Sequence, residues 1–279
     1  MQSVPLDILY SSSFDFTRAS GFAAALVAVC RGSPSGFLHW MGVLCSSWVT
    51  TSRGSTGRSM INPAGCQGLP SVDASNLMAW RVALLCLATS ALGGVWVIEQ
   101  PGSSILIESD PMQMVCGLLQ VFKCRFWMWH YQSRTAKPTV LWSPSSAIRT
   151  FWRGRLNLAE VRAEKQARNP QNRQAPTRKY KDAGGRQRFQ GTSELKGTGK
   201  YTFKFGAKIA EEMKTLISRA PRPVFQDADL AEATDIWANW SWDDSSWSSA
   251  EMLDVVKYLY GSKDLRIPAK WRPLLPETL

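Results

Sequence analysis

The sequence predicts an α/β fold: a partial Rossmann-like parallel sheet with helices on both faces, followed by a basic, partly disordered C-terminal extension. Apolar segments in the first half alternate between strand-like and helix-like lengths, as in βαβ units. The net charge of +11 is unevenly spread, because residues 1–148, 149–208 and 209–279 carry +3, +12 and −4. We therefore expect an α/β core (1–148), a basic segment (149–208) and an acidic, tryptophan-rich tail (209–279).

Local signals place the elements of the core. An apolar, alanine-rich stretch predicts the first helix, which ends before Gly32 and Pro34. Asp73 is suited to cap a second helix, and the pair Gly93-Gly94 ends it. Short apolar runs that follow loops predict buried strands. The expected helices are 14–30, 73–92, 111–123 and 209–219, and the expected strands are 37–44, 95–98, 125–131 and 140–142.

The composition excludes several classes of protein. A uniformly basic, histone-like protein is excluded, because one segment holds the excess positive charge. The six cysteines form no CxxC pair and only two histidines are present, so we expect no metal site. The first residues lack a signal-peptide pattern, and the uncharged run 82–98 is short for a membrane span and contains helix breakers. We expect reduced thiols, no membrane and an intracellular location, nuclear or cytoplasmic.

Two candidate catalytic side chains come at the ends of predicted strands. Cys45 follows the run 37–44, and Glu99 follows the run 95–98 directly. The carboxyl ends of parallel strands meet at one edge of a sheet, where functional groups gather. There Cys45 is suited to act as a nucleophile, and Glu99 to hydrogen-bond to or protonate a ring nitrogen. The alternatives are a buried cysteine that packs as an apolar group, and a carboxylate that faces water or pairs with Arg81.

A loop rich in glycine, serine and arginine follows Cys45 over residues 50–70. Backbone N–H groups in such a loop, together with Arg53 and Arg58, are suited to approach a phosphate. No Gly-Lys-Ser/Thr sequence follows, so the loop does not match a nucleoside-triphosphate-binding P-loop. The alternative interpretation is a flexible surface loop.

In the basic segment, aromatic residues alternate with positive charges. Lysine and arginine neutralise phosphates, and aromatic rings stack on unpaired bases, so this mixture predicts contact with nucleic acid. The alternative is a solvated basic linker. The residues assigned to nucleic-acid binding are Arg178, Lys179, Lys181, Arg186 and Arg188.

Three sequence blocks resemble, in order, motifs of the cytosine-C5 DNA methyltransferases, particularly a phage-type branch. The block GVLCSSW (42–48) is similar to the Pro-Cys nucleophile motif, and VWVIEQP (95–101) is similar to the Glu-Asn motif. The block from Trp129 to Trp142, which contains KPT at 137–139, resembles a third motif. The similarity covers roughly residues 37–145, and the order of the blocks is its most specific feature. The whole chain also resembles a much-expanded family of proteins from unicellular algae.

The resemblance implies a role for each matching residue. Cys45 would attack C6 of a flipped cytosine, and Glu99 would hold the base through N3 and the exocyclic amine. Lys137 and Thr139 would help to shape the pocket or the strand behind it. The implied cofactor is S-adenosylmethionine, and the implied partner is nucleic acid, DNA before RNA. The residues expected to contact substrate are Ser46, Ser47, Arg53, Arg58, Lys137 and Thr139.

The chain also departs from that family. Leu44 replaces the proline before the nucleophile, and Gln100 replaces the usual asparagine. No Phe-x-Gly-x-Gly loop precedes Cys45, and the first 36 residues differ from the βαβ unit that cradles the cofactor. Only Arg134 lies near the position of the family's paired arginines. Two functions are therefore expected: a cytosine-C5 DNA methyltransferase-like protein that transfers a methyl group from S-adenosylmethionine, or a catalytically inactive, nucleic-acid-binding remnant of such a domain.

Overall fold

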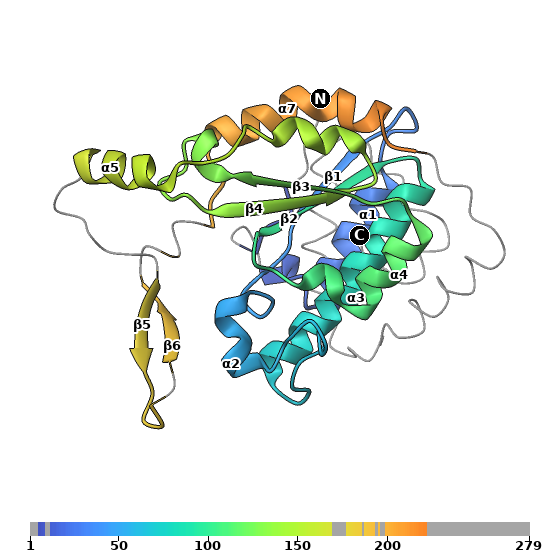
Figure 1. The fold of residues 1–279 in the computed structure, drawn as a ribbon. Helices are drawn as coiled ribbons and strands as arrows, with labels where there is room; N and C mark the ends of the chain where they lie inside the picture. The colour runs from blue at the N-terminus through green and yellow to red at the C-terminus, as the bar shows by residue number, and fades with distance from the viewer. Residues whose placement is uncertain are drawn as a thin grey trace. The chain divides into compact units, whose positions relative to one another are not determined.

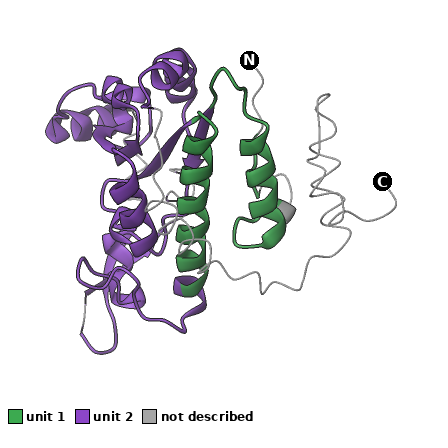
Figure 2. Cartoon of the chain, turned by 90° about the vertical axis from the view of Figure 1, so that its right-hand side faces the viewer, with its two compact units in different colours: residues 1–37, 73–94, 222–279 green, residues 38–72, 95–221 purple. Residues whose placement is uncertain are grey.

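A computed structural model describes most of the chain as two compact units (Figure 1, Figure 2). One unit comprises residues 1–37, 73–94 and 222–279, and the other comprises residues 38–72 and 95–221. Most of the predicted acidic tail lies outside the described residues. The residues that the structure describes are 5–8, 12–168, 177–185, 187–192, 195 and 199–221.

The second unit is built on a four-stranded sheet with the strand order β1-β2-β4-β3. Its strands are β1 (Leu38–Gly42), β2 (Val95–Pro101), β3 (Phe122–Trp127) and β4 (Pro138–Ser143). β1 pairs in parallel with β2, whereas β4 pairs antiparallel with both β2 and β3. The fold is α/β as predicted, but the sheet is mixed, which corrects the expectation of a parallel sheet.

A short connection explains the reversed strand. Residues 128–137 join β3 to β4 and contain the 3-10 helix η4 (Met128–Tyr131) but no α-helix. A parallel connection needs a crossover of about a dozen or more residues, usually with an α-helix, whereas antiparallel neighbours need only a short turn. The longer connection from β2 to β3 contains α4 (Asp110–Leu118), and these two strands run in the same direction.

One face of the sheet carries a hydrophobic core in which α7 (Phe203–Ser218) and η5 (Ser146–Phe151) take part. Several aromatic rings meet there: Phe126 stacks on Phe205 with 5.6 Å between centroids, and Tyr131 and Phe151 pack around Phe205. The helix expected at 209–219 starts earlier, because the Thr202 side chain accepts a hydrogen bond from the Phe205 N–H and caps it. The hydrophobic core between the sheet and α7 thus holds β1 and β2 in place.

The basic segment contains regular structure where it is described. It includes α5 (Leu158–Arg168) and an antiparallel hairpin of β5 (Thr177–Lys181) and β6 (Gln187–Gly191). The boundaries expected after residues 148 and 208 fall inside η5 and α7. The parts of the segment that lie outside the described residues are 169–176, 186, 193–194 and 196–198.

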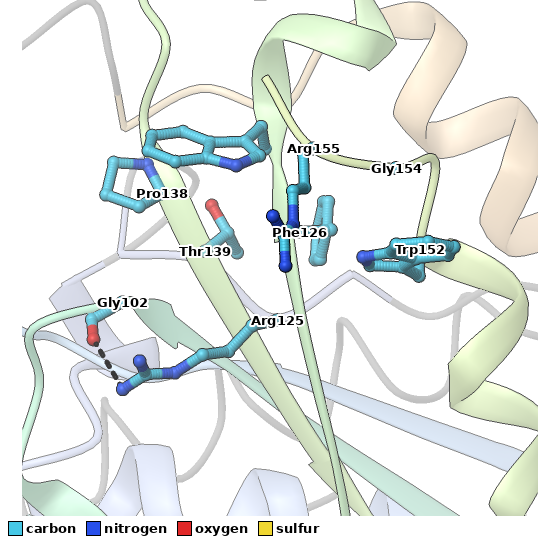
Figure 3. A pocket seen from close by; sticks show the side chains of 9 residues that line it. Gly102, Arg125, Phe126, Pro138, Thr139, Trp152, Gly154 and Arg155 are labelled. Atoms are coloured by element: carbon cyan, nitrogen blue, oxygen red, sulfur yellow. Dashed lines mark hydrogen bonds between the residues drawn. The ribbon is translucent and has the colours of Figure 1, made fainter. Parts of the chain in front are cut away.

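A pocket of about 360 Å³ lies where β3 and β4 meet the chain that follows η5 (Figure 3). Its walls come from the end of β3, the start of β4 and the residues after Phe151. The lining residues are Gly102, Arg125, Phe126, Trp127, Pro138, Thr139, Trp152, Gly154 and Arg155.

The first unit contains α1 (Ala19–Cys30) and, from residue 73, most of α3 (Pro70–Ala91). Arg81 of α3 donates a hydrogen bond to the Phe16 carbonyl at 3.0 Å. Among the described residues, α3 alone is long and apolar enough to cross a membrane by length and composition, and 61% of that window is buried. Burial of this degree also suits the core helix of a folded domain.

Candidate functional site

The parallel pairing of β1 with β2 brings the two candidate catalytic residues to one edge of the sheet. Gly42, the last residue of β1, lies opposite Glu99 in the pairing register. Cys45 follows Gly42 closely, and the charges of Glu99 and Lys137 both act on its thiol. Glu99 is only 6% exposed. Glu99 and Lys137 therefore lie near enough to Cys45 for their charges to act on the pKa of its thiol.

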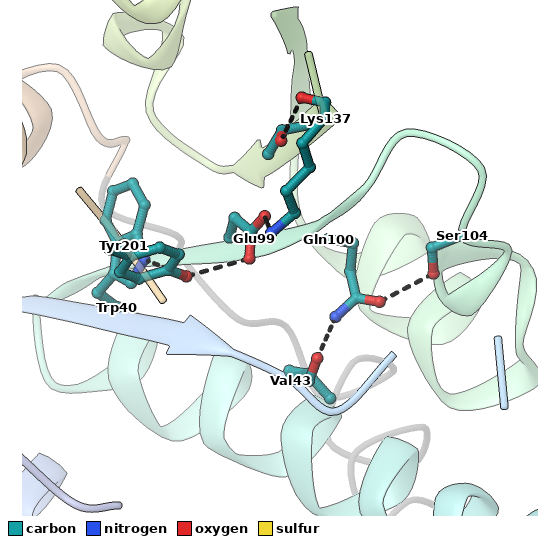
Figure 4. A network of polar contacts seen from close by, with 8 residues as sticks. Trp40, Val43, Glu99, Gln100, Ser104, Lys137 and Tyr201 are labelled. Carbon is teal, nitrogen blue, oxygen red and sulfur yellow. Dashed lines mark hydrogen bonds and ion pairs between the residues drawn. The ribbon is translucent and has the colours of Figure 1, made fainter. Parts of the chain in front are cut away.

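Both carboxylate oxygens of Glu99 have partners (Figure 4). Lys137 Nζ lies 3.3 Å from Oε1, and the Tyr201 hydroxyl donates to Oε2 at 3.1 Å. Trp40 Nε1 in turn donates to the Tyr201 hydroxyl at 3.2 Å. We call these residues and Cys45 the Glu99 cluster. In this cluster the buried carboxylate of Glu99 interacts with the positive charge of Lys137 and with the neutral hydroxyl of Tyr201.

Burial controls the ionisation of Cys45. It raises the pKa of the thiol; Lys137 opposes this change and Glu99 reinforces it. Burial and the charge of Glu99 also raise the pKa of Tyr201, so its hydroxyl stays protonated and can donate to the carboxylate. A free thiol rather than a thiolate is thus the resting form of Cys45 at neutral pH. Attack on a substrate requires that the thiol first lose its proton.

Gln100 fixes the backbone that leads to Cys45. Its Nε2 donates to the Val43 carbonyl at 2.5 Å, and Ser104 Oγ donates to its Oε1 at 2.9 Å (Figure 4). The side chain is fully buried. Gln100, which replaces the asparagine of the family motif, therefore has a structural role. Its two hydrogen bonds connect the chain after β1 to the chain after β2.

Arg58 supports the loop after Cys45 from the inside. Its guanidinium donates to Ser47 Oγ at 2.7 Å, to the Val72 carbonyl at 3.2 Å and to the Pro63 carbonyl. It also lies over the Trp48 ring, 3.5 Å from the centroid. Burial lowers its pKa to about 10, so it stays charged at neutral pH. The expectation that Arg58 and Ser47 face a substrate is corrected, because these groups bind each other inside the loop.

The other residues expected to contact substrate differ in exposure. Ser46 and Arg53 are exposed, and Arg53 begins the short helix α2 (Arg53–Thr56). Thr139 is buried and its hydroxyl donates to the Lys137 carbonyl at 3.3 Å, which holds the backbone at the start of β4. Of these residues, Lys137 is the one that pairs with Glu99.

The predicted nucleic-acid-binding residues lie on the hairpin. Arg178, Lys179 and Lys181 are on β5 and Arg188 is on β6, whereas Arg186 lies outside the described residues. Arg188 pairs with Asp182 at 2.9 Å and donates to the Gly54 carbonyl at 2.9 Å, which joins the hairpin to α2. The hairpin thus presents exposed basic side chains, while Arg188 also attaches it to the loop after Cys45.

Sequence reasoning missed Tyr201 and Trp40 as members of the site. The alternation of side chains along a strand could have found Trp40, because it shares a sheet face with Gly42, which lies opposite Glu99. Tyr201 stands in the aromatic and basic pattern of the second half, yet nothing in that pattern indicates that its hydroxyl reaches Glu99. Such long-range contacts arise only when the chain folds.

The described residues do not fit the cofactor that the resemblance implies. A methyltransferase cradles S-adenosylmethionine with a glycine-rich loop between a strand and a helix N-terminus. Within the described part of residues 5–37, the helices η1 (Ser12–Phe14) and α1 occur, but no strand precedes α1. Arg18 stands at the α1 N-cap without a side-chain cap. Nor do the described residues hold a group of three or more metal-ligating side chains.

Comparisons with protein-family models, with curated proteins and with solved structures give no match.

Proposed function

We propose that this chain is a cytosine-C5 DNA methyltransferase-like protein, in which the Glu99 cluster binds a cytosine base that has left the DNA stack. One observation carries the proposal. The parallel pairing of β1 with β2 brings the end of β1, three residues before the Cys45 thiol, opposite the buried carboxylate of Glu99, and Lys137 pairs with that carboxylate. A thiol that attacks a ring carbon needs a neighbouring group that binds the ring as its charge changes.

The cluster supports addition to the base. The thiolate of Cys45 forms a bond to C6 of cytosine, and the electron pair of the C5–C6 double bond moves to C5, which takes a proton from water. Glu99 binds the N3 and exocyclic amine edge, where charge builds up during addition. Loss of the original C5 hydrogen as a proton then restores the double bond, and the thiolate leaves. The net result is exchange of the C5 hydrogen with water.

Methyl transfer needs more than the described residues supply, since they do not fit S-adenosylmethionine. The proposal therefore assigns base binding and activation at C5 to the Glu99 cluster. The nucleic acid is DNA, bound in part by the basic hairpin, whose exposed cations neutralise phosphates.

A second function has its own support: the chain is a nucleic-acid-binding remnant without chemistry. The Tyr201 hydroxyl occupies an oxygen of Glu99 that a base would need, and burial raises the pKa of the Cys45 thiol. Both features oppose addition to cytosine. They leave binding by the hairpin unaffected.

Hydrogen exchange at C5 separates the two functions without any cofactor. Single-stranded DNA that carries tritium at cytosine C5 is incubated with the full chain, and tritium released to water is counted. We expect release by the wild-type chain and release at the buffer level for Cys45→Ser, because a hydroxyl is a far weaker nucleophile than a thiolate. Arg162→Gln, on the exposed face of α5, is the control and keeps the wild-type rate.

Two results would contradict the enzyme-like function. Release that is unchanged in Cys45→Ser excludes Cys45 as the nucleophile. Release at the buffer level by the wild-type chain, with DNA still bound, establishes the remnant. Tight binding of S-adenosylmethionine in a calorimetric titration would instead favour the enzyme-like function and would contradict only the poor fit of the cofactor described above.

A further inference from the structure

The pocket beside β3 and β4 combines aromatic and cationic side chains at its rim (Figure 3). Trp152 is 59% exposed, although a tryptophan ring of this size loses most of its contact with water in a typical folded protein. Trp127 and Phe126 line the same pocket. The volume of about 360 Å³ falls in the range of small-molecule sites, roughly 300–1,000 Å³.

The charged residues that line the pocket are all positive. Arg125 and Arg155 line it, both are exposed, and none of the described lining residues is acidic. Arg125 donates to the Gly102 carbonyl at 3.3 Å, which holds its guanidinium at the rim (Figure 3). The guanidinium retains further N–H donors beyond this contact, since arginine has five. A planar ligand with an attached anion matches this arrangement.

The pocket adjoins the Glu99 cluster along the chain. Lys137, which pairs with Glu99, is followed directly by the lining residues Pro138 and Thr139. The Gly102 N–H donates to the Pro138 carbonyl at 2.8 Å, so this junction is fixed. Consecutive Cα atoms are about 3.8 Å apart, so the pocket begins within one residue of the cluster.

We propose that this pocket binds an unpaired nucleotide of a DNA single strand, beside the nucleotide that enters the Glu99 cluster. The base stacks on Trp152, and Arg155 and Arg125 bind the flanking phosphates. Stacking on an aromatic ring accepts any base, because every base has a π face, so the pocket holds the strand without reading its sequence. The identity of the polymer rests on the proposed function, whereas binding at the pocket requires no chemistry at Cys45.

A homopolymer without cytosine tests the pocket alone. Short fluorescein-labelled oligo(dT) is titrated with the full chain, and the dissociation constant is measured by anisotropy at several salt concentrations. We expect Trp152→Ala to weaken binding about tenfold, in line with the loss of one base stack. Arg155→Gln should weaken binding and reduce the slope of log K against log salt by about 0.7, the loss of one phosphate contact on a single strand.

Two control variants replace residues of the same types outside the pocket. Phe203→Ala removes another exposed aromatic ring, 94% exposed, and Arg162→Gln removes another exposed cation. Both lie outside the pocket, and we expect the affinity to stay within about twofold of wild type because screening weakens remote charges. Circular dichroism checks that every variant keeps its fold, which is expected because Trp152 and Arg155 are exposed.

The proposal is overturned if Trp152→Ala binds oligo(dT) like wild type, or if Arg162→Gln weakens binding as much as Arg155→Gln. It is also overturned if the pocket variants lose binding of a proline-rich peptide while oligo(dT) binding is unchanged. Cys45→Ser separates this proposal from the proposed function. It should abolish tritium release and leave oligo(dT) affinity unchanged, so each proposal can fail by itself.

Discussion

The Glu99 cluster and the pocket beside it are built in opposite ways. In the cluster, polar groups satisfy one another: Glu99 binds Lys137 and Tyr201, and Tyr201 binds Trp40. In the pocket, Trp152 stays 59% exposed and Arg155 is exposed. A ligand must displace existing hydrogen bonds to enter the cluster, whereas it meets open surface at the pocket.

This difference assigns different tasks to neighbouring residues. A satisfied, buried network costs free energy when it opens, so it is suited to admit only a ligand that replaces the broken contacts. An exposed aromatic and cationic surface binds many ligands with little reorganisation. We therefore expect the pocket to hold the strand first and the cluster to select the base afterwards.

The largest expected effect is a loss of stability when a buried arginine near the cluster is replaced, compared with an exposed arginine of the pocket. Arg58→Met removes hydrogen bonds to Ser47 and to two carbonyls and leaves these groups unpaired. We expect it to lower the free energy of unfolding by about 3 kcal/mol, since each buried group without a partner costs about 1–3 kcal/mol. Arg155→Met should change it by less than about 0.5 kcal/mol, as for other surface substitutions.

Urea denaturation of both variants, followed by circular dichroism, measures this difference. Equal losses of stability in the two variants would mean that the Arg58 contacts contribute no more than surface contacts. That result would contradict the proposed contrast between a buried, closed cluster and an exposed, open pocket.

The sequence predicts where the first two strands lie better than it predicts the direction of the strands in the sheet. Short apolar runs predict β1 and β2, but β2 continues past residue 98 to Pro101, so Glu99 lies within the strand and opposite Gly42, the last residue of β1. The direction of β4 depends on the connection 128–137, whose 3-10 helix η4 has little hydrophobic periodicity. The pattern of apolar runs alone therefore favours a parallel sheet, whereas the short connection makes β4 antiparallel and the sheet mixed.

The site was predicted in part for a similar reason. Cys45, Glu99 and Lys137 lie in blocks whose order resembles a known motif set, so they could be named from the sequence. Tyr201 lies far from Glu99 in sequence, and only the packing of α7 on the sheet brings its hydroxyl to the carboxylate. Arg58 is predicted to contact a substrate, because the glycine and serine residues around it do not reveal that its guanidinium is buried.

A smaller effect is expected when the cluster loses one internal contact. Tyr201→Phe keeps the ring but removes the hydroxyl that donates to Glu99. A base then no longer competes with this hydrogen bond, which is worth about 1 kcal/mol. We expect tritium release from cytosine to rise about fivefold, the rate equivalent of that free energy.

Tyr180→Phe is the matched control, because Tyr180 is a half-exposed tyrosine on β5, away from Glu99. It should release tritium at the wild-type rate. A slower rate in Tyr201→Phe would show instead that the hydroxyl helps Glu99 to bind the base, and the cluster would then be arranged for its ligand rather than closed against it.

The last comparison concerns the charges that act on Cys45 inside the cluster. Burial and Glu99 raise the pKa of its thiol, and Lys137 lowers it. Only the thiolate reacts with iodoacetamide, so the rate at Cys45 should rise with pH and reach its midpoint above the usual thiol range. Glu99→Gln removes a negative charge and should move this midpoint to lower pH. Lys137→Met removes a positive charge and should move it to higher pH.

Mass spectrometry of the Cys45 peptide measures each rate, and Cys66, which is exposed, serves as the internal reference. Shifts of the same sign in both variants would show that altered packing, rather than charge, controls this thiol.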